Sequence, residues 1–138
     1  MTQEEKQLLI QDICTRLPYE LKIEVCVKDK DIKSVDYVKY DTVGVYIKLV
    51  DDENFSIKPY LRSLSLMTNE EKQQFREFIS WTYDCNWDSD TIEGIINNNY
   101  IEPQCIIKLI DWLNAHQFDY RGLIKKELAS SIVEKTHN

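Results

Sequence analysis

The amino-acid sequence predicts an α+β domain, and three observations support this class. Apolar residues at helical spacing open the chain, apolar residues at every second position follow from Leu21, and helical spacing returns after Met67. Strands grouped together and followed by helices are typical of α+β domains, whose helices gather on one face of an antiparallel sheet. We therefore expect an N-terminal helix, a three- to four-stranded antiparallel meander, and then two main helices packed on one sheet face.

The length of the chain, 138 residues, corresponds to one domain. A hydrophobic fraction of 43% is enough for a buried core, so a domain of this size needs neither disulfides nor a structural metal. The last residues of the chain are expected to fray. We place a single α+β domain at residues 1–129 and a frayed C-terminal tail at residues 130–138.

The first helix is expected to begin at a capping box, because Thr2 and Glu5 have the Ser/Thr-x-x-Glu spacing. Leu9 and Ile13 follow at helical spacing, and Pro18 is expected to end the helix. Glu4, Gln11, Asp12 and Arg16 lie elsewhere around the turn.

Four segments are candidates for strands. In residues 20–28, apolar side chains alternate with polar ones, and residues 32–40 have a second, less regular pattern. Residues 42–50, with the sequence TVGVYIKLV, also have apolar side chains at every second position, so a third strand is expected there. Residues 55–60 add a short strand, which Pro59 should confine to the edge of the sheet. Because the connections are short, the strands are expected to pair antiparallel.

Two long helices and one short helix are expected in the second half of the chain. Thr68 and Glu71 form a second capping-box pattern at the start of the first long helix. The second long helix is expected over residues 102–116, with Pro103 in its first turn. The short helix is expected over residues 121–129. The apolar stripes of the two long helices comprise Phe75, Phe78, Ile79, Tyr83, Ile106, Leu109, Ile110 and Leu113.

The formal net charge of -7 argues against sequence-independent binding of nucleic acid, which needs clustered Lys and Arg. The acidic excess is concentrated between residues 84 and 119, where seven acidic residues accompany one lysine. No apolar run reaches the roughly 18 residues that a membrane helix needs. The N-terminal segment is acidic where a signal peptide would be basic. We therefore expect an intracellular protein that binds neither nucleic acid nor a membrane.

Neither a metal site nor a cofactor site is indicated. Cys14, Cys26, Cys85 and Cys105 are widely spaced without a CxxC pair, which favours reduced, buried thiols over zinc ligands. The chain also has no GxGxxG, P-loop, HExxH or GxSxG motif. Cys105 and His116 would lie roughly 16 Å apart along one helix, too far for a catalytic dyad. We assign no catalytic residue, and we expect His116 to bond the last carbonyls of its helix.

Two segments are candidates for recognition. The segment 81–90, WTYDCNWDSD, mixes aromatic rings with carboxylates, which suits a binding surface as well as a solvated loop. The segment 119–121 follows the last long helix, where its side chains either hold a turn or present exposed contacts. The residues that we select as binding contacts are Trp87, Asp88, Asp90, Asp119, Tyr120 and Arg121.

Three stretches resemble a known family: EEKQLLIQDICTRLPYELK, IKPYLRSLSLMTNEEKQQF and DWLNAHQFDYRGLIKKELA. They resemble small uncharacterised proteins encoded by phages, prophages and mobile elements of gut bacteria, in which the last motif reads DWLNAHHFDYRGLI. In this chain Gln117 replaces the second His of that motif, Glu20 stands where Gly is frequent, and Ser63 precedes Leu64 where Pro-Leu is common. The resemblance covers neither the strands nor residues 81–90, and it supplies no catalytic residue.

The resemblance implies a small acidic accessory protein of a phage or mobile element, located in the cytoplasm of the bacterial host. Such proteins often act by binding a host protein, so we expect a non-enzymatic inhibitor or modulator of a host protein, including defence proteins, without a cofactor. One alternative is an oligomeric structural phage component. The other is a small-ligand binder or enzyme with a pocket between sheet and helices, lined by Tyr37, Tyr46, Trp112 and His116.

Overall fold

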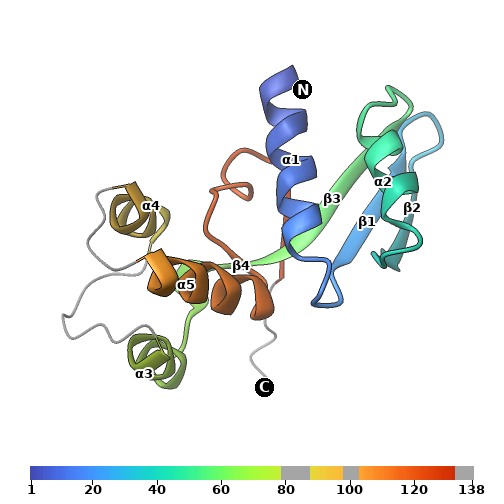
Figure 1. The fold of residues 1–138 in the computed structure, drawn as a ribbon. Helices are drawn as coiled ribbons and strands as arrows, with labels where there is room; N and C mark the ends of the chain where they lie inside the picture. The colour runs from blue at the N-terminus through green and yellow to red at the C-terminus, as the bar shows by residue number, and fades with distance from the viewer. Residues whose placement is uncertain (79–87, 98–102, 133–138) are drawn as a thin grey trace, which may run out of the picture.

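The computed structural model describes residues 1–78, 88–97 and 103–132 and confirms the α+β class, with an N-terminal helix, antiparallel strands and then further helices (Figure 1). Helix α1 (Gln3–Thr15) begins at the predicted capping box. The backbone N–H of Glu5 donates to Thr2 Oγ1 at 3.1 Å, and the backbone N–H of Thr2 donates to the Glu5 carboxylate at 2.9 Å. The first turn of α1 is therefore held by bonds between residues only three positions apart.

Strands β1 (Lys22–Val27), β2 (Ile32–Tyr37) and β3 (Phe55–Ser63) form the antiparallel part of the sheet, with β1 between the other two. β1 and β2 form a hairpin, and β3 returns beside β1, so the strand order is not that of a simple meander. Two short strands, β4 (Phe118–Asp119) and β5 (Ser130–Ser131), run parallel to β3.

The third strand that we predicted at residues 42–50 is instead helix α2 (Val43–Val50). The same run places Val43, Tyr46, Ile47 and Val50 at positions i, i+3, i+4 and i+7, which is one face of a helix. Tyr46 and Val50 are buried, whereas Val45 is exposed. A short apolar run fits the period of a strand as well as that of a helix. In this protein the run forms a helix, which buries Tyr46 and Val50 against α1 and the sheet.

Pro59 lies within β3, which pairs with β1 on one side and with β4 and β5 on the other, so the prediction of an edge strand is wrong. The backbone N–H of Lys28 donates to Asn54 O at 3.0 Å, which places the β1–β3 hydrogen bonds at the even-numbered residues of β3. Pro59 lies opposite Ile23 at a position where the backbone nitrogen points away from β1. The missing N–H of Pro59 therefore removes no bond of the β1–β3 ladder.

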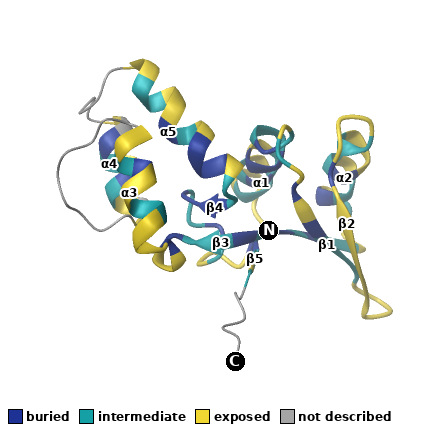
Figure 2. Ribbon diagram, turned by 90° about the horizontal axis from the view of Figure 1, so that it is seen from below, coloured by how far each residue is buried: buried dark blue, intermediate teal, exposed yellow. Residues whose placement is uncertain are grey.

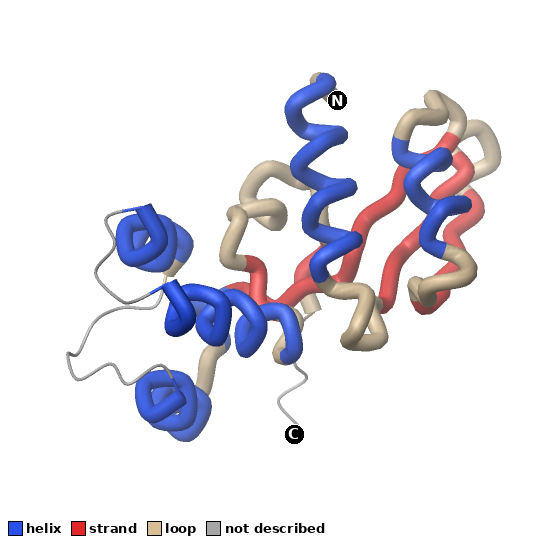
Figure 3. The backbone as a smooth tube through the Cα atoms, in the orientation of Figure 1, coloured by secondary structure: helices blue, strands red, loops and turns tan. Residues whose placement is uncertain are grey.

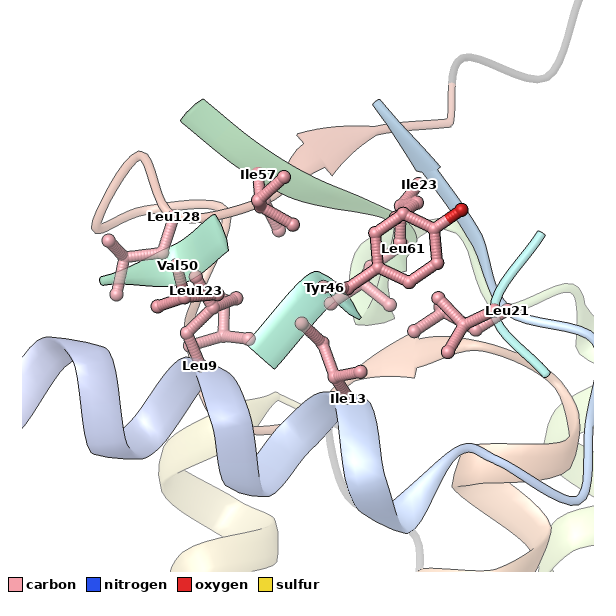
Figure 4. Close-up of a cluster of buried hydrophobic side chains, with 12 residues drawn as sticks. Leu9, Ile13, Leu21, Ile23, Tyr46, Val50, Ile57, Leu61, Leu123 and Leu128 are labelled. Atoms are coloured by element: carbon pink, nitrogen blue, oxygen red, sulfur yellow. The ribbon is translucent and has the colours of Figure 1, made fainter. Parts of the chain in front are cut away.

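Helices α1 and α2 cover one face of the sheet, and the side chains between them form a first hydrophobic core (Figures 1 and 4). Full burial of a Leu or Ile side chain contributes roughly 1.5–3 kcal/mol, so this core holds both helices on the strands. Its buried members are Leu9, Ile13, Leu21, Ile23, Val38, Tyr46, Val50, Ile57, Leu61, Leu123, Leu128 and Ala129.

Helices α3 (Asn69–Phe78), α4 (Ser89–Asn97) and α5 (Pro103–Ala115) pack around a second core beyond the 3-10 turn η1 (Leu64–Leu66). We expected α3 and α5 on the sheet face, but α1 and α2 already cover that face. Phe75 is buried as predicted and Phe78 is exposed; Ile79 and Tyr83 lie outside the described residues. The second core comprises Leu64, Met67, Phe75, Ile92, Ile95, Leu109, Trp112, Leu113, Phe118 and Tyr120.

The segment after β4 forms turns and not the short helix that we predicted over residues 121–129 (Figure 3). Gly122 (φ 73°) and Glu127 (φ 62°) both adopt left-handed backbone conformations, which interrupt a helix. The assignment of residues 130–132 to a frayed tail is wrong, because Ser130 and Ser131 pair with β3 and the backbone N–H of Ile132 donates to Leu61 O at 2.8 Å. Residues 133–138 of that tail lie outside the described residues.

The second predicted capping box is present at α3 and is joined to β3 by an ion pair. Both terminal nitrogens of Arg62 donate to the Glu71 carboxylate at 2.8 Å, and the backbone N–H of Thr68 donates to the same carboxylate at 3.0 Å. The bonds from Arg62, followed by those from Thr68, lower the pKa of Glu71 from its ordinary value of 4.5 to about 2.

We expect Glu71→Gln to lower the free energy of unfolding by roughly 2 kcal/mol at pH 7, because a charge-assisted pair is lost. A folded-state pKa below the ordinary value means that the pair stabilises the fold above about pH 4.5. That contribution is lost as the pH falls through about 2. Urea denaturation of both proteins from pH 7 to pH 2 should show the difference shrinking, with the exposed Glu70→Gln as control. A difference that is independent of pH would contradict this assignment.

Candidate binding surface

The structure places the six predicted binding residues in different environments. Asp88 and Asp90 are exposed at the start of α4, and Trp87 lies outside the described residues. Asp119 and Tyr120 are buried, each with only 7% of its surface exposed, so our expectation that they are exposed contacts is wrong. Their burial favours the other interpretation of the segment 119–121, in which these residues hold a turn.

Asp119 organises the turn that follows β4. Its carboxylate accepts hydrogen bonds from the backbone N–H groups of Leu123 and Ile124, both at 2.9 Å. A side chain that accepts from backbone groups a few residues further on replaces the bonds that a helix would supply. Asp119 therefore keeps Leu123 in the first core.

A buried ion pair joins α1 to this C-terminal segment. Asp12 and Arg16 are both fully buried, and the Asp12 carboxylate accepts from Arg16 Nε at 2.9 Å and from Arg16 Nη2 at 3.1 Å. Arg16 Nη2 also donates to Phe118 O at 2.7 Å, and Arg121 Nη1 donates to Asp12 Oδ1 at 2.7 Å. Asp12 and Arg16, which the sequence places away from the apolar stripe of α1, are therefore part of the buried interior.

Tyr120 completes this network. Its hydroxyl donates to Asn114 Oδ1 at 2.9 Å, and the guanidinium carbons of Arg121 and Arg16 lie 4.6 Å and 5.4 Å from the centroid of its ring. These contacts use the polar groups of the C-terminal motif to hold the fold together. We call the following residues the clasp: Asp12, Arg16, Asn114, Phe118, Tyr120 and Arg121.

The sequence contained one signal for the clasp that we did not use. Asp12 and Arg16 are four residues apart, the spacing of a helical ion pair, and each follows a member of the Leu9–Ile13 stripe by three positions. This spacing places the pair beside the apolar face of α1. It does not reveal that Arg121 and Phe118, about a hundred positions away, would cover the pair.

The pocket that we predicted from Tyr37, Tyr46, Trp112 and His116 is not formed. Tyr46 is in the first core, Trp112 is in the second core, and Tyr37 is exposed on β2. His116 stacks on Trp112 with 3.9 Å between ring centroids, and its Nδ1 donates to Trp112 O at 2.8 Å. This bond confirms the predicted role of His116 at the C-terminal end of its helix.

A cleft of about 700 Å³ between α1 and α4 collects three of the predicted binding residues: Asp90, Tyr120 and Arg121. The lining includes Asp90 and Glu93 of α4 and Lys125 and Lys126 of the segment after β4. All four of these charged residues are exposed. Tyr120 and Arg121 are already bonded within the clasp. The charged groups that remain available to a ligand are therefore the four exposed residues at the rim of the cleft.

The described residues show neither a metal site nor a membrane span. Within them, no group of three or more His, Cys, Asp or Glu side chains could hold a metal ion. Cys14, Cys26 and Cys105 are half-buried free thiols, and Cys85 lies outside the described part of the chain. No helix in that part is long and apolar enough to cross a membrane.

Strand β2 presents the most exposed apolar surface of the described residues. All six residues of β2 are exposed, as Figure 2 shows by the yellow of this strand. Five of the nine large hydrophobic side chains that are exposed in the described residues lie within residues 32–45. We call these five the β2 patch: Ile32 (54% exposed), Val35 (51%), Tyr37 (48%), Tyr40 (72%) and Val45 (58%).

The outer side of β2 also carries free backbone groups. The backbone N–H of Val38 donates to Leu21 O at 2.9 Å, which places the β1–β2 hydrogen bonds at the even-numbered residues of β2. The N–H and C=O groups of Lys33 and Val35 therefore point away from β1, where no strand of the described residues pairs with β2. The N–H of Tyr37 points the same way and donates to its neighbour Asp36.

A hollow of about 470 Å³ lies at the C-terminal end of β2. Its lining includes Leu17, Pro18, Tyr37, Val38 and Tyr40. Two members of the β2 patch thus form part of a concave, largely apolar surface. The irregular apolar pattern that we noted in the sequence reflects, over residues 32–37, a strand whose two faces are both exposed.

Comparison of the chain with protein-family models, with curated proteins and with solved structures finds no match. We therefore infer the function from the geometry of β2 and its surroundings.

Proposed function

We propose that this chain is a non-enzymatic binding protein that accepts an extended segment of a partner protein along the free side of β2. One observation carries this proposal: an edge strand with unpaired backbone groups coincides with the β2 patch. A peptide that adds a strand to a sheet gains affinity from main-chain hydrogen bonds and specificity from alternate side chains.

The composition of β2 supports this role. Proteins usually protect exposed edge strands with proline, bulges, covering loops or charged side chains, because free edges pair with other chains. β2 has six residues, and only Lys33 and Asp36 among them are charged. Its pairing with β1 is continuous from Ile32 to Tyr37, without a bulge. Contiguous exposed apolar surface of this kind is typical of interaction sites.

The resemblance to phage and mobile-element proteins suggests the source of the partner. Under this proposal the partner is a protein of the bacterial host, and the chain is a small accessory protein that inhibits or modulates it, for example in host defence. Binding would occur in the host cytoplasm. The acidic residues Asp88 and Asp90 are exposed at α4 and would serve at most as secondary contacts.

The variant Val35→Pro tests the proposal, because it removes an N–H that points outwards and leaves the β1–β2 ladder intact. We expect its free energy of unfolding to stay within roughly 1 kcal/mol of the wild type. We expect its affinity for a partner purified from host lysate to fall by at least about tenfold, as measured by calorimetry.

Val35→Thr is the matched control, because it keeps both the N–H and the β-branched shape. This control should retain the affinity of the wild type. A folded Val35→Pro protein that binds the purified partner as tightly as the wild type would refute pairing at β2.

A further inference from the structure

We infer that the segment accepted at β2 is an acidic strand, in which carboxylate side chains alternate with apolar ones. This inference rests on the proposed function and names the chemistry of the partner. It follows from the different character of the two faces of the sheet beside the free side of β2.

One face of the sheet is not covered by α1 or α2. Ile23 and Ile57 point towards the first core, so their neighbours Lys22, Glu24 and Lys58 point to the opposite face. Lys33, Val35 and Tyr37 of β2 lie on this opposite face too, because they pair with Cys26, Glu24 and Lys22, respectively. The uncovered face therefore holds three lysines and one glutamate across β1, β2 and β3.

The single carboxylate on this face is already engaged. Glu24 accepts from the Tyr60 hydroxyl at 3.2 Å and from the Ser130 hydroxyl at 3.4 Å, and it lies 3.8 Å from Lys33 Nζ. Lys22 Nζ lies 5.3 Å from the centroid of the Tyr60 ring. The face is thus positive, although the whole chain has a net charge of -7. Charge complementarity favours a negatively charged occupant.

The other side of β2 is apolar near its start. Asp36 of β2 accepts a hydrogen bond from Tyr46 of α2, which shows that the even-numbered residues of β2 face α2. Ile32 belongs to this set, and Val45 is exposed on α2. A strand added beside β2 would place every second side chain over the lysine face and the others beside Ile32 and α2. Acidic and apolar residues in alternation match this arrangement.

The same features disfavour two other occupants. A second copy paired through β2 would extend the lysine face with another lysine, because Lys33 of each copy would lie on it. A single-stranded nucleic acid would match the charge, but it would leave the outward N–H groups of Lys33 and Val35 without strand partners. The Tyr60 ring is also occupied by Lys22, which removes one stacking platform.

The experiment uses three peptides of about eight residues, a typical strand length. One alternates Glu with Val, one alternates Lys with Val, and one has the Glu and Val residues in two separate blocks. Binding is followed by the NMR amide shifts of residues 32–37 in the full chain. We expect the alternating Glu peptide to bind at least about tenfold more tightly than the other two, with an affinity that falls as salt is added.

Two sets of variants separate this inference from the proposed function. The Lys22→Glu, Lys33→Glu double variant should reverse the preference towards the alternating Lys peptide, whereas the exposed Lys48→Glu on α2 should leave it unchanged. Val35→Pro should abolish binding of all three peptides. If Val35→Pro abolishes binding but the double variant keeps the original preference, strand addition stands and the acidic partner is refuted. If Val35→Pro binds the peptides as the wild type does, both proposals fail.

Two further measurements address the other occupants. Light scattering of the wild type should show a monomer, and a dimer that Val35→Pro disrupts would assign β2 to a second copy. An oligothymidylate that binds residues 32–37 more tightly than the alternating Glu peptide does, in wild type and Val35→Pro alike, would assign the lysine face to nucleic acid. Either result would overturn the inference.

Discussion

Asp12→Ala is expected to lower the free energy of unfolding by roughly 3–5 kcal/mol, which would leave little stable protein at 37 °C. Asp12 is fully buried and accepts three hydrogen bonds from two guanidinium groups, those of Arg16 and Arg121. Alanine at this position would leave the fully buried Arg16 without its carboxylate. The cost of an uncompensated buried charge exceeds the net contribution of the intact pair. Urea denaturation followed by circular dichroism measures this loss.

Three other variants define the cause of that loss. Glu4→Ala removes an exposed carboxylate from the same helix and should change the stability by less than about 0.5 kcal/mol. Arg121→Ala should cost less than Asp12→Ala, because 14% of the Arg121 side chain is exposed and its loss leaves the Asp12–Arg16 pair in place. The double variant Asp12→Leu, Arg16→Met replaces both charges with apolar groups and should recover part of the loss. If Asp12→Ala is as stable as Glu4→Ala, the clasp does not hold the fold.

Phe118→Ala is expected to lower the free energy of unfolding by roughly 3–5 kcal/mol, because it opens a cavity in the second core. The Phe118 ring is fully buried, lies parallel to Trp112 with 5.9 Å between centroids, and has the Arg62 guanidinium carbon 4.2 Å from its centroid. Its backbone carbonyl accepts from Arg16 of the clasp. The side chain supports the second core while the backbone holds α1.

The loss of stability in Phe118→Ala should affect both α1 and α5. Amide hydrogen exchange should speed up in α1 as well as in α5, because the cavity loosens the carbonyl that Arg16 binds. Phe78→Ala is the matched control, since Phe78 is exposed and should change the stability by less than about 0.5 kcal/mol. If amide exchange becomes faster in α5 but not in α1, Phe118 does not couple the second core to α1.

Local patterns in the sequence were predicted correctly. Both capping boxes, Thr2 with Glu5 and Thr68 with Glu71, are present, because their bonds join residues three positions apart. The bond from His116 to Trp112 O is equally local. The β1–β2 hairpin also has a short connection and a clear period of two in its first strand. Each of these features depends on a few neighbouring residues.

Predictions that depended on distant segments were wrong. Residues 43–50 carry the periods of both a strand and a helix, and packing against α1 and the sheet selects the helix. The tolerance of β3 for Pro59 depends on which of its N–H groups face β1, and the strand pairing decides this. The candidate site also depends on strand pairing. The backbone groups of Val35 are free because, among the described strands, β2 pairs with β1 only.

The sequence by itself determined the α+β class, the start of α1 and the capping box at the start of α3, since these follow from spacing along the chain. Only the tertiary structure decided that Asp12 and Arg16 are buried and that β2 is left open. The physical reason is that burial and strand pairing depend on which residues from distant parts of the chain pack against a segment. Phe118 and Arg121 bond to Arg16 and Asp12, respectively, and no described strand pairs with the free side of β2.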